Sequence, residues 1–379
     1  MRIGKGGLWS AAVGFILIFA ACSSSPAPAV DAQIPAEWEV SLTAPESSPN
    51  KKRLLNFLAD EYGKRIISGQ MDTSWTTNED MDMIARVYAD TGKYPALKGF
   101  DLLQHPYDTW PYRGGREQIN EAVEWWEGKN NDVPLLADRS DIHGIVAICW
   151  HWRTGSSREF YTSKTNFRIP WKNGRLDMGS DNFQAIIQDM DKVASLLNVL
   201  KEKDIPVLWR PLHEASGGWF WWGASGSQPY IALWEFMYHY FTNVKGLNNL
   251  IWVWNGENTA WFPDPVTVDI AGLDLYNASY SPRKHEFERS LARVSTRDLM
   301  VALTENDKLP DPDDCIKNEA MWSWFMTWND MRFSPGETHK DNFWTGEFHN
   351  PQAYKNKVYH HAAVITLDKL PDLTAYRLE

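Results

Sequence analysis

Short apolar runs alternate with helical periods over most of the chain. Eight runs have the length and side-chain composition of buried strands, and helical patterns separate most of them. The runs are 65–70, 95–101, 144–152, 206–214, 250–256, 269–276, 299–306 and 322–330. Near-continuous apolar strands that alternate with helices indicate a parallel sheet that is covered on both faces.

The clearest helical period begins after Ser180 and Asp181, which are suitable helix caps. Its apolar stripe comprises Phe183, Ile186, Ile187, Met190, Val193, Leu196, Leu197 and Leu200. Eight strand–helix units predict a (β/α)₈ TIM barrel, with a single catalytic domain over 50–379. A doubly wound open sheet is the alternative. That fold favours a glycine-rich phosphate turn, and neither G-x-G-x-x-G nor a Walker sequence follows any of the runs.

The N-terminus has the features of a bacterial lipoprotein signal. Arg2 and Lys5 precede an apolar run, 8–21, that is too short for a bilayer span of about 20 residues but suits a signal peptide. Residues 19–22, FAAC, resemble a lipobox in which Cys22 is lipidated, although Phe19 stands where Leu is usual. We therefore predict a signal peptide over 1–21 and a lipid anchor at Cys22. An ordinary signal with a chance cysteine is the alternative.

The segment 22–49 is rich in Ser, Pro and Ala, which predicts a tether between the anchor and the domain. Ser23 after the cysteine favours the outer membrane of a Gram-negative cell, on its periplasmic or extracellular face. Cys149 and Cys315 are the other two cysteines, too few for a disulfide framework or a zinc site. We interpret both as small buried hydrophobes.

The composition favours a neutral, amphipathic ligand. The formal net charge is −11, which disfavours nucleic acid as a partner. The chain contains 21 Trp, 14 Tyr and 16 Phe, and a Trp ring combines a flat apolar face with one donor. Sugar rings, apolar on their C–H faces and polar at their rims, match such side chains.

A barrel places its chemistry at the C-terminal ends of the strands. The polar residues at the C-terminal ends of the predicted strands are His151, Glu214, Asp274, Tyr276, Glu305, Asn329 and Asp330. The long segments 102–115, 153–180 and 331–351 also follow strands and are rich in aromatic residues. Loops of this length are usually functional or disordered, and their rings argue against disorder.

Glu214 and Glu305 end the fourth and seventh strands, which lie nearly opposite in an eight-stranded barrel. Two carboxylates that face each other across an aromatic cleft suit glycoside hydrolysis, in which one protonates the leaving oxygen and the other attacks or activates water. Two separate acids, each paired with Arg or Lys, are the alternative. Strand alternation predicts these residues on the inward face: Arg210, Leu212 and Glu214, and Val301, Leu303 and Glu305.

The stretch WRPLHEASGGWFWWG, 209–223, resembles the signature of glycoside hydrolase family 26, whose best-known members are β-mannanases. The resemblance continues through SGQ (68–70), PALKGFD (95–101), WHW (150–152), GLDLY (272–276) and LTEN (303–306). It implies a retaining (β/α)₈ glycosidase with Glu214 as acid/base and Glu305 as nucleophile. Most of the clan has Asn before the acid, whereas this family and this sequence have His, here His213.

The resemblance also implies supporting roles. His151 and His213 would hydrogen-bond the sugar beside the scissile bond, Tyr276 would orient the nucleophile, and Trp328 would form the floor under that sugar. Tyr276 and Trp328 as rim packing, and His151 as a core histidine, are the alternatives. Trp219 and Glu305 are expected to raise the pKa of Glu214. Arg210 either forms an ion pair that keeps Glu305 ionised or serves only to fill the interior of the barrel.

The predicted function is that of a retaining endo-β-1,4-mannanase that acts on mannan, glucomannan or galactomannan as a monomer. Residue 217 is Gly, so no H-E-x-x-H zinc motif begins at His213, and we expect neither a metal nor a cofactor in the chemistry. A β-1,3-xylanase, a mixed-linkage β-glucanase, an exo-enzyme that releases mannobiose and a non-catalytic surface glycan-binding protein remain as alternatives.

Overall fold

The computed structural model describes residues 46–74, 82–106, 114–129, 141–276, 284–293, 299–330, 339 and 342–378. The predicted signal peptide, Cys22 and most of the predicted tether lie outside the described residues, as do Tyr107, Trp110, Tyr112 and Phe333 of the aromatic segments. Within the described part, no helix is both long and apolar enough to cross a membrane.

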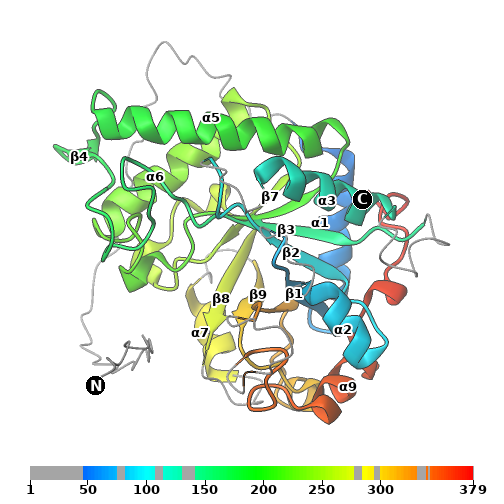
Figure 1. Ribbon diagram of the computed structural model, residues 1–379. Helices are drawn as coiled ribbons and strands as arrows, with labels where there is room; N and C mark the ends of the chain where they lie inside the picture. Colours follow the sequence, from blue (N-terminus) through cyan, green and yellow to red (C-terminus); the bar gives the residue numbers. More distant parts are fainter. Residues whose placement is uncertain are drawn as a thin grey trace, which may run out of the picture.

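Eight parallel strands form a closed barrel, which confirms the predicted (β/α)₈ architecture (Figure 1). Each strand pairs with the next one in the barrel, and the last pairs with the first, so the barrel has no free edge. The strands are β1 (Ile66–Met71), β2 (Leu97–Asp101), β3 (Ile145–Cys149), β6 (Val207–Arg210), β7 (Leu250–Trp254), β8 (Ile270–Leu275), β9 (Met300–Asn306) and β10 (Trp324–Thr327). All eight predicted strands are therefore present.

Helices surround the barrel and connect most of the strands (Figure 1). They are α1 (Pro49–Glu61), α2 (Met83–Thr91), α3 (Gly115–Glu127), α5 (Asp181–Glu202), α6 (Ser227–His239), α7 (Lys284–Arg293), α8 (Pro312–Lys317) and α9 (Gln352–His360). The helix predicted after Ser180 is α5, and the Ser180 hydroxyl accepts a hydrogen bond from the Phe183 N–H as its cap. Two short 3₁₀ turns, Thr259–Trp261 and Pro265–Thr267, occupy the β7–β8 connection in place of an α-helix.

Among the described residues, three smaller strands lie outside this barrel. The two-residue strands β4 (Trp171–Lys172) and β5 (Arg175–Leu176) form an antiparallel hairpin in the long segment after β3. Strand β11 (Val364–Ile365) pairs in parallel with the start of β1. The segment 153–180 also contacts the segment that carries Trp219, because the Thr162 N–H donates to the Trp219 carbonyl at 2.8 Å.

Helix α1 begins beside the N-terminal ends of three strands. The Ser48 N–H donates to the Asn248 carbonyl at 3.1 Å, and the Asn50 side chain donates to the Asp204 carbonyl at 3.0 Å. The Lys51 ammonium lies 3.2 Å from the Asp269 carboxylate. These partners precede β7, β6 and β8, so the chain enters the barrel at the end opposite the C-terminal ends of the strands.

The prediction of inward-facing side chains from strand alternation is wrong for both strands that were expected to carry the glutamates. Strand β6 ends at Arg210, and both Leu212 and Glu214 have a left-handed φ of 52°, so no strand pleat extends to Glu214. In β9, Leu303 pairs with Leu273 whereas Glu305 pairs with Asp274, so Thr304 is an extra residue in a β-bulge.

The bulge changes which side chains of β9 face the barrel interior. Asp274 points inward to Arg210, so its neighbour Leu273 faces the surrounding helices, and Leu303, paired with Leu273, faces the same way. Thr304 points inward, where its hydroxyl donates to Asp274 at 2.6 Å. The prediction that Val301 and Leu303 share the inward face of Glu305 is therefore wrong.

Most of the tryptophans lie in the core. Twelve of them are fully buried: Trp125, Trp150, Trp152, Trp209, Trp221, Trp222, Trp234, Trp252, Trp254, Trp322, Trp324 and Trp344. Trp252 shows their usual place, since it projects from β7 against Trp234 and Tyr238 of α6, with ring centroids 5.7 and 5.2 Å away. Of the three tryptophans in the GGWFWWG stretch, only Trp219 is partly exposed. Trp221 and Trp222 are therefore core residues and do not line a sugar-binding surface, although their place beside Glu214 in the sequence suggests it. Cys149 and Cys315 are free and buried, as predicted.

Candidate active site

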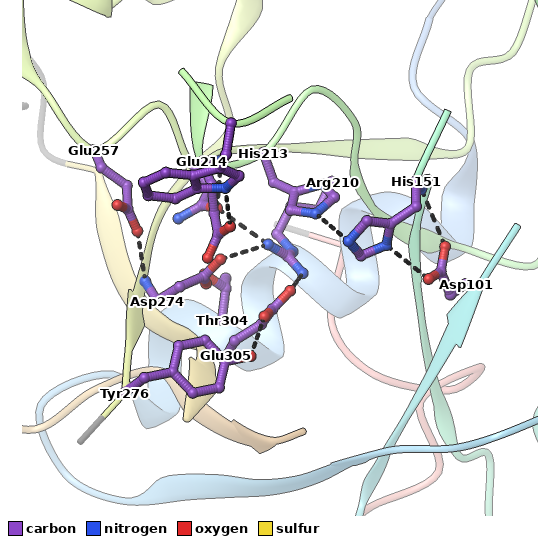
Figure 2. Close-up of polar contacts among 12 residues, drawn as sticks. Asp101, His151, Arg210, His213, Glu214, Glu257, Asp274, Tyr276, Thr304 and Glu305 are labelled. Carbon is purple, nitrogen blue, oxygen red and sulfur yellow. Dashed lines mark hydrogen bonds and ion pairs between the residues drawn. The ribbon is translucent and has the colours of Figure 1, made fainter. Parts of the chain in front are cut away.

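A buried arginine connects three polar side chains at the mouth of the barrel (Figure 2). Arg210, the last residue of β6, places its Nη1 2.9 Å from Asp274 Oδ2 and 3.0 Å from Asn255 Oδ1. Its Nη2 forms a short ion pair with Glu305 Oε1. Burial alone would lower the pKa of Arg210, but the attraction of Asp274 and Glu305 outweighs burial and raises it. The guanidinium is therefore a fixed positive charge against Glu305.

The second oxygen of Glu305 is held by Tyr276. The Tyr276 hydroxyl donates a short hydrogen bond to Glu305 Oε2, and Tyr276 follows directly after β8. Burial and the neighbouring Glu305 carboxylate raise the pKa of the Tyr276 phenol well above its ordinary value. The phenol therefore stays protonated and acts as a donor. Both oxygens of Glu305 are thus oriented by groups on other strands.

Glu214 lies in a different environment from Glu305. It is half-buried, and its Oε2 accepts a hydrogen bond from the Trp219 indole N–H at 2.9 Å. Burial, followed by repulsion from Glu305, Asp274 and Glu257, raises the pKa of Glu214 well above its ordinary value. The repulsion from Glu305 is as predicted. The Trp219 hydrogen bond lowers that pKa, and the share of the Trp219 ring in the burial that raises it stays a prediction. Glu214 is therefore suited to hold a proton near neutral pH.

The glycines after Glu214 allow the turn that presents this residue. Glu214 is followed by a 3₁₀ turn, Ala215–Gly217, and its backbone N–H donates to the Asn255 carbonyl at 2.8 Å. A Cβ atom on Gly217 would lie 2.0 Å from the Trp219 ring, and one on Gly223 would lie 2.0 Å from the Ala215 carbonyl oxygen. Only glycine fits both positions, which explains their place in the sequence pattern around Glu214.

The separation of the two glutamates favours one of the two classes of glycoside hydrolysis. Carboxylate oxygens of Glu214, Asp274 and Glu305 all lie within 4.8 Å of one another. Retaining enzymes hold their two carboxyl groups about 5–5.5 Å apart, whereas inverting enzymes need about 6.5–9.5 Å to admit a water molecule. The arrangement therefore suits direct attack by one carboxylate on a sugar.

Two histidines lie beside this carboxylate cluster. His213 Nε2 lies 3.2 Å from His151 Nε2, and the planes of the two rings are nearly perpendicular. The Trp328 ring, which is almost fully buried, lies 5.8 Å from the His151 ring between centroids. The structure thus brings together all eight residues of the predicted sugar site: His151, Arg210, His213, Glu214, Trp219, Tyr276, Glu305 and Trp328.

Two groups of described side chains have the geometry to hold a metal ion. One comprises Glu214, Asp274 and Glu305, and the other Asp101, Cys149 and His151. In the first group the Arg210 guanidinium already supplies the positive charge. In the second, His151 Nδ1 is engaged by Asp101 at 2.7 Å. Chemistry without a metal or a cofactor stays a prediction.

Sequence reasoning missed several residues that shape the site. Asp101 is the last residue of a predicted strand and Asn255 is the last but one of another, and that position was the available signal for them. Thr304 was hidden by the bulge, and Glu257 lies in an irregular connection with a left-handed φ of 59°. Asp330, which also ends a predicted strand, binds the backbone N–H groups of the later loop instead, including that of Trp344 at 2.7 Å.

Glu257→Gln is expected to lower the pKa of Glu214, because it removes a charge that disfavours ionisation. The acid form of Glu214 would then be lost at lower pH, so the basic limb of the pH profile of kcat/KM moves to lower pH. Gln still offers an oxygen to the Asp274 N–H, which Glu257 accepts at 3.1 Å. The control is Glu202→Gln, at the exposed end of α5. A basic limb that stays in place or moves upward would contradict the assignment.

Comparison with known proteins places this geometry in a family. The model of the family described as Glycosyl hydrolase family 26 matches residues 43–369. Mannan endo-1,4-beta-mannosidase A of Piromyces sp is 32% identical over 354 residues, which cover 91% of this chain and 53% of that protein. Mannan endo-1,4-beta-mannosidase of Thermothelomyces thermophilus is 33% identical over 340 residues, covering 87% of this chain and 63% of that protein. The chain thus spans between half and two thirds of the length of these relatives.

Solved structures of similar proteins share the fold. The GH26-CBM35 beta-(1,4)-mannanase of Podospora anserina has a TM-score of 0.72 and 29% identity, over 93% of this chain and 72% of that one. A beta-mannanase from a symbiotic protist of the termite Reticulitermes speratus, complexed with gluco-manno-oligosaccharide, also has a TM-score of 0.72 and 29% identity. The match covers 88% of this chain and 99% of that one.

Proposed function

The chain belongs to glycosyl hydrolase family 26, and from this premise we propose that it is a retaining endo-β-1,4-mannanase. The membership confirms the family resemblance of the sequence. The proposal names mannan, glucomannan and galactomannan as substrates, in line with the names of the relatives. The observation that carries it is the contrast between Glu305 and Glu214, which have carboxylate oxygens within 4.8 Å of each other. Glu305 is ion-paired with Arg210, whereas Glu214 has a raised pKa.

In the first step, a carboxylate oxygen of Glu305 attacks the anomeric carbon and forms a glycosyl ester as the glycosidic C–O bond breaks. Glu214 gives its proton to the leaving oxygen, so the departing sugar leaves as an alcohol. Arg210 and Tyr276 keep the Glu305 oxygens aimed, since each holds one of them. The raised pKa of Glu214 keeps its proton available at neutral pH.

In the second step, Glu214 is a carboxylate and takes a proton from water. The water oxygen attacks the anomeric carbon, the ester bond to Glu305 breaks, and the proton remains on Glu214. Both carboxyl groups return to their starting states. Two inversions at one carbon give a product with the β-configuration of the substrate.

A product profile tests the proposed activity. We expect faster cleavage of unbranched mannan or glucomannan than of β-1,3-xylan or barley glucan, with mixed oligosaccharides early in the digest. Faster cleavage of barley glucan or β-1,3-xylan would overturn the mannanase assignment, and mannobiose alone from the start would indicate an exo-enzyme. Binding of mannan without any product would favour a glycan-binding protein. Glu305→Ala, assayed in parallel, identifies hydrolysis by a contaminant.

We also propose that Cys22 carries a lipid and that residues 22–49 link it to the barrel, so that the protein is a monomeric enzyme anchored to the cell envelope. The bonds of Ser48, Asn50 and Lys51 near the N-terminal ends of β6, β7 and β8 support this arrangement, because a tether attached there leaves the strand C-termini unobstructed. Stable anchoring needs more than one acyl chain. Membrane fractions should retain the wild type and Ser23→Ala but lose Cys22→Ala. A wild type that is entirely soluble would refute the anchor.

A further inference from the structure

Asp101, the last residue of β2, binds His151 at two points. Its Oδ1 accepts the His151 backbone N–H at 3.1 Å, and its Oδ2 lies 2.7 Å from His151 Nδ1 (Figure 2). Asp101 is buried, with 2% of its surface exposed. An ionised carboxylate can only accept hydrogen bonds, so His151 Nδ1 must carry a proton. A ring with that single proton has a lone pair on Nε2.

His213 fixes the direction of the next hydrogen bond independently. Burial, with repulsion from the Arg210 guanidinium, lowers the pKa of His213 well below its ordinary value, so the ring is neutral and carries one proton. Its Nδ1 is buried and has no hydrogen-bond partner among the described residues. A buried N–H without a partner is rarely tolerated, so the proton is on Nε2. There it points at His151 Nε2, 3.2 Å away.

We propose that Asp101 is a positioning residue that sets a one-way chain of hydrogen bonds, from His213 Nε2–H to His151 Nε2 and from His151 Nδ1–H to the Asp101 carboxylate. This role rests on the proposed hydrolysis, since the two rings lie beside the glutamates. These two atoms satisfy each other, so a sugar hydroxyl binds here by taking the place of that hydrogen bond, donating to His151 Nε2 and accepting from His213 Nε2–H. Asp101 therefore determines that His151 is the ring that accepts a hydrogen bond from the sugar hydroxyl and that His213 is the ring that donates one.

The wild-type protein tests the proposal directly. Long-range ¹⁵N–¹H spectra of the imidazole rings at neutral pH should show the proton of His151 on Nδ1 and that of His213 on Nε2. His151→Phe and His213→Gln assign the signals. A His151 proton on Nε2, or protons on both of its nitrogens, would overturn the proposal. This readout needs no substrate, so it is independent of the mannanase assignment.

Asp101→Asn should reverse the tautomer of His151 while keeping the shape of the side chain. The amide oxygen can still accept the His151 backbone N–H, which leaves the amide NH₂ facing Nδ1. His151 must then carry its proton on Nε2, opposite the His213 Nε2–H at 3.2 Å. We expect kcat/KM on mannan to fall about tenfold to hundredfold, because two donors face each other or a buried N–H loses its partner. An unchanged His151 tautomer in this variant would refute the role.

Testing Asp101→Asn in a protein that also carries His213→Gln shows whether Asp101 acts through the tautomer of His151 or through packing. In His213→Gln, the amide can turn its oxygen toward a His151 Nε2–H, so Asp101→Asn should cost less than about threefold there. Equal losses in both backgrounds would mean that Asp101 acts by packing alone. Asp189→Asn is the matched control, since this buried carboxylate accepts the Trp152 ring N–H at 3.0 Å and that ring has no second tautomer. It should keep the wild-type tautomer of His151 and activity within about twofold.

Discussion

Glu305→Ala is expected to reduce hydrolysis of every substrate by about 10⁵-fold or more, because no other described carboxylate is held to attack the anomeric carbon. The fold should survive, since Arg210 keeps its ion pair with Asp274 at 2.9 Å and its charge stays compensated. Initial rates on mannan and circular dichroism measure the two effects.

The matched control for this variant is Glu305→Gln, which keeps hydrogen-bonding groups facing both Arg210 and Tyr276. It should be as inactive as Glu305→Ala, because an amide is a poor nucleophile. If Glu305→Gln retained more than about one hundredth of wild-type activity, Glu305 would serve only to hold Arg210, and the nucleophile would have to be sought elsewhere.

Glu214→Ala is expected to lower kcat on mannan by about 10²–10⁴-fold, the usual contribution of a general acid. The loss should depend on the leaving group. An aryl mannoside whose phenolate leaves without protonation should still form the glycosyl-enzyme, which then accumulates because no base activates water. Rapid mixing should therefore show a burst of phenolate followed by a slow steady state.

Trp219→Phe separates the acid from its neighbour in the same assay. It removes the indole donor to Glu214, 2.9 Å away, but leaves the carboxyl group itself in place, so it should not produce a burst. A Glu214→Ala protein that lost equal activity on mannan and on the aryl mannoside would contradict the acid role, because the leaving group would then make no difference.

The barrel could be predicted from the sequence because its signal is repeated eight times. Each apolar run is locally distinct, and closure follows once eight parallel strands alternate with helices. Glu214 and Glu305 could be found because both lie at the ends of predicted strands, in motifs that resemble one family. The glycines at 217 and 223 are part of that motif for a local steric reason, their close approach to Trp219 and Ala215.

The errors arose where local patterns stop determining the structure. Strand alternation assumes an unbroken pleat, which the bulge at Thr304 and the left-handed residues Leu212 and Glu214 interrupt. Tryptophan content suggested a sugar-binding surface, but a ring in a sequence does not reveal whether helices cover it, as they cover Trp252. Asp101 illustrates the same limit, because its partner His151 lies 50 residues away.

The most direct test of the two-glutamate mechanism is the anomeric configuration of the products formed with azide, determined by NMR. In Glu214→Ala, azide needs no general base and attacks the glycosyl-enzyme on Glu305, so the product should be the β-glycosyl azide. In Glu305→Ala, azide takes the place of the missing nucleophile and attacks the substrate once, so the product should be the α-glycosyl azide. The account predicts these two opposite configurations. An α-azide from Glu214→Ala together with a β-azide from Glu305→Ala would contradict it, because the two glutamates would then have exchanged roles.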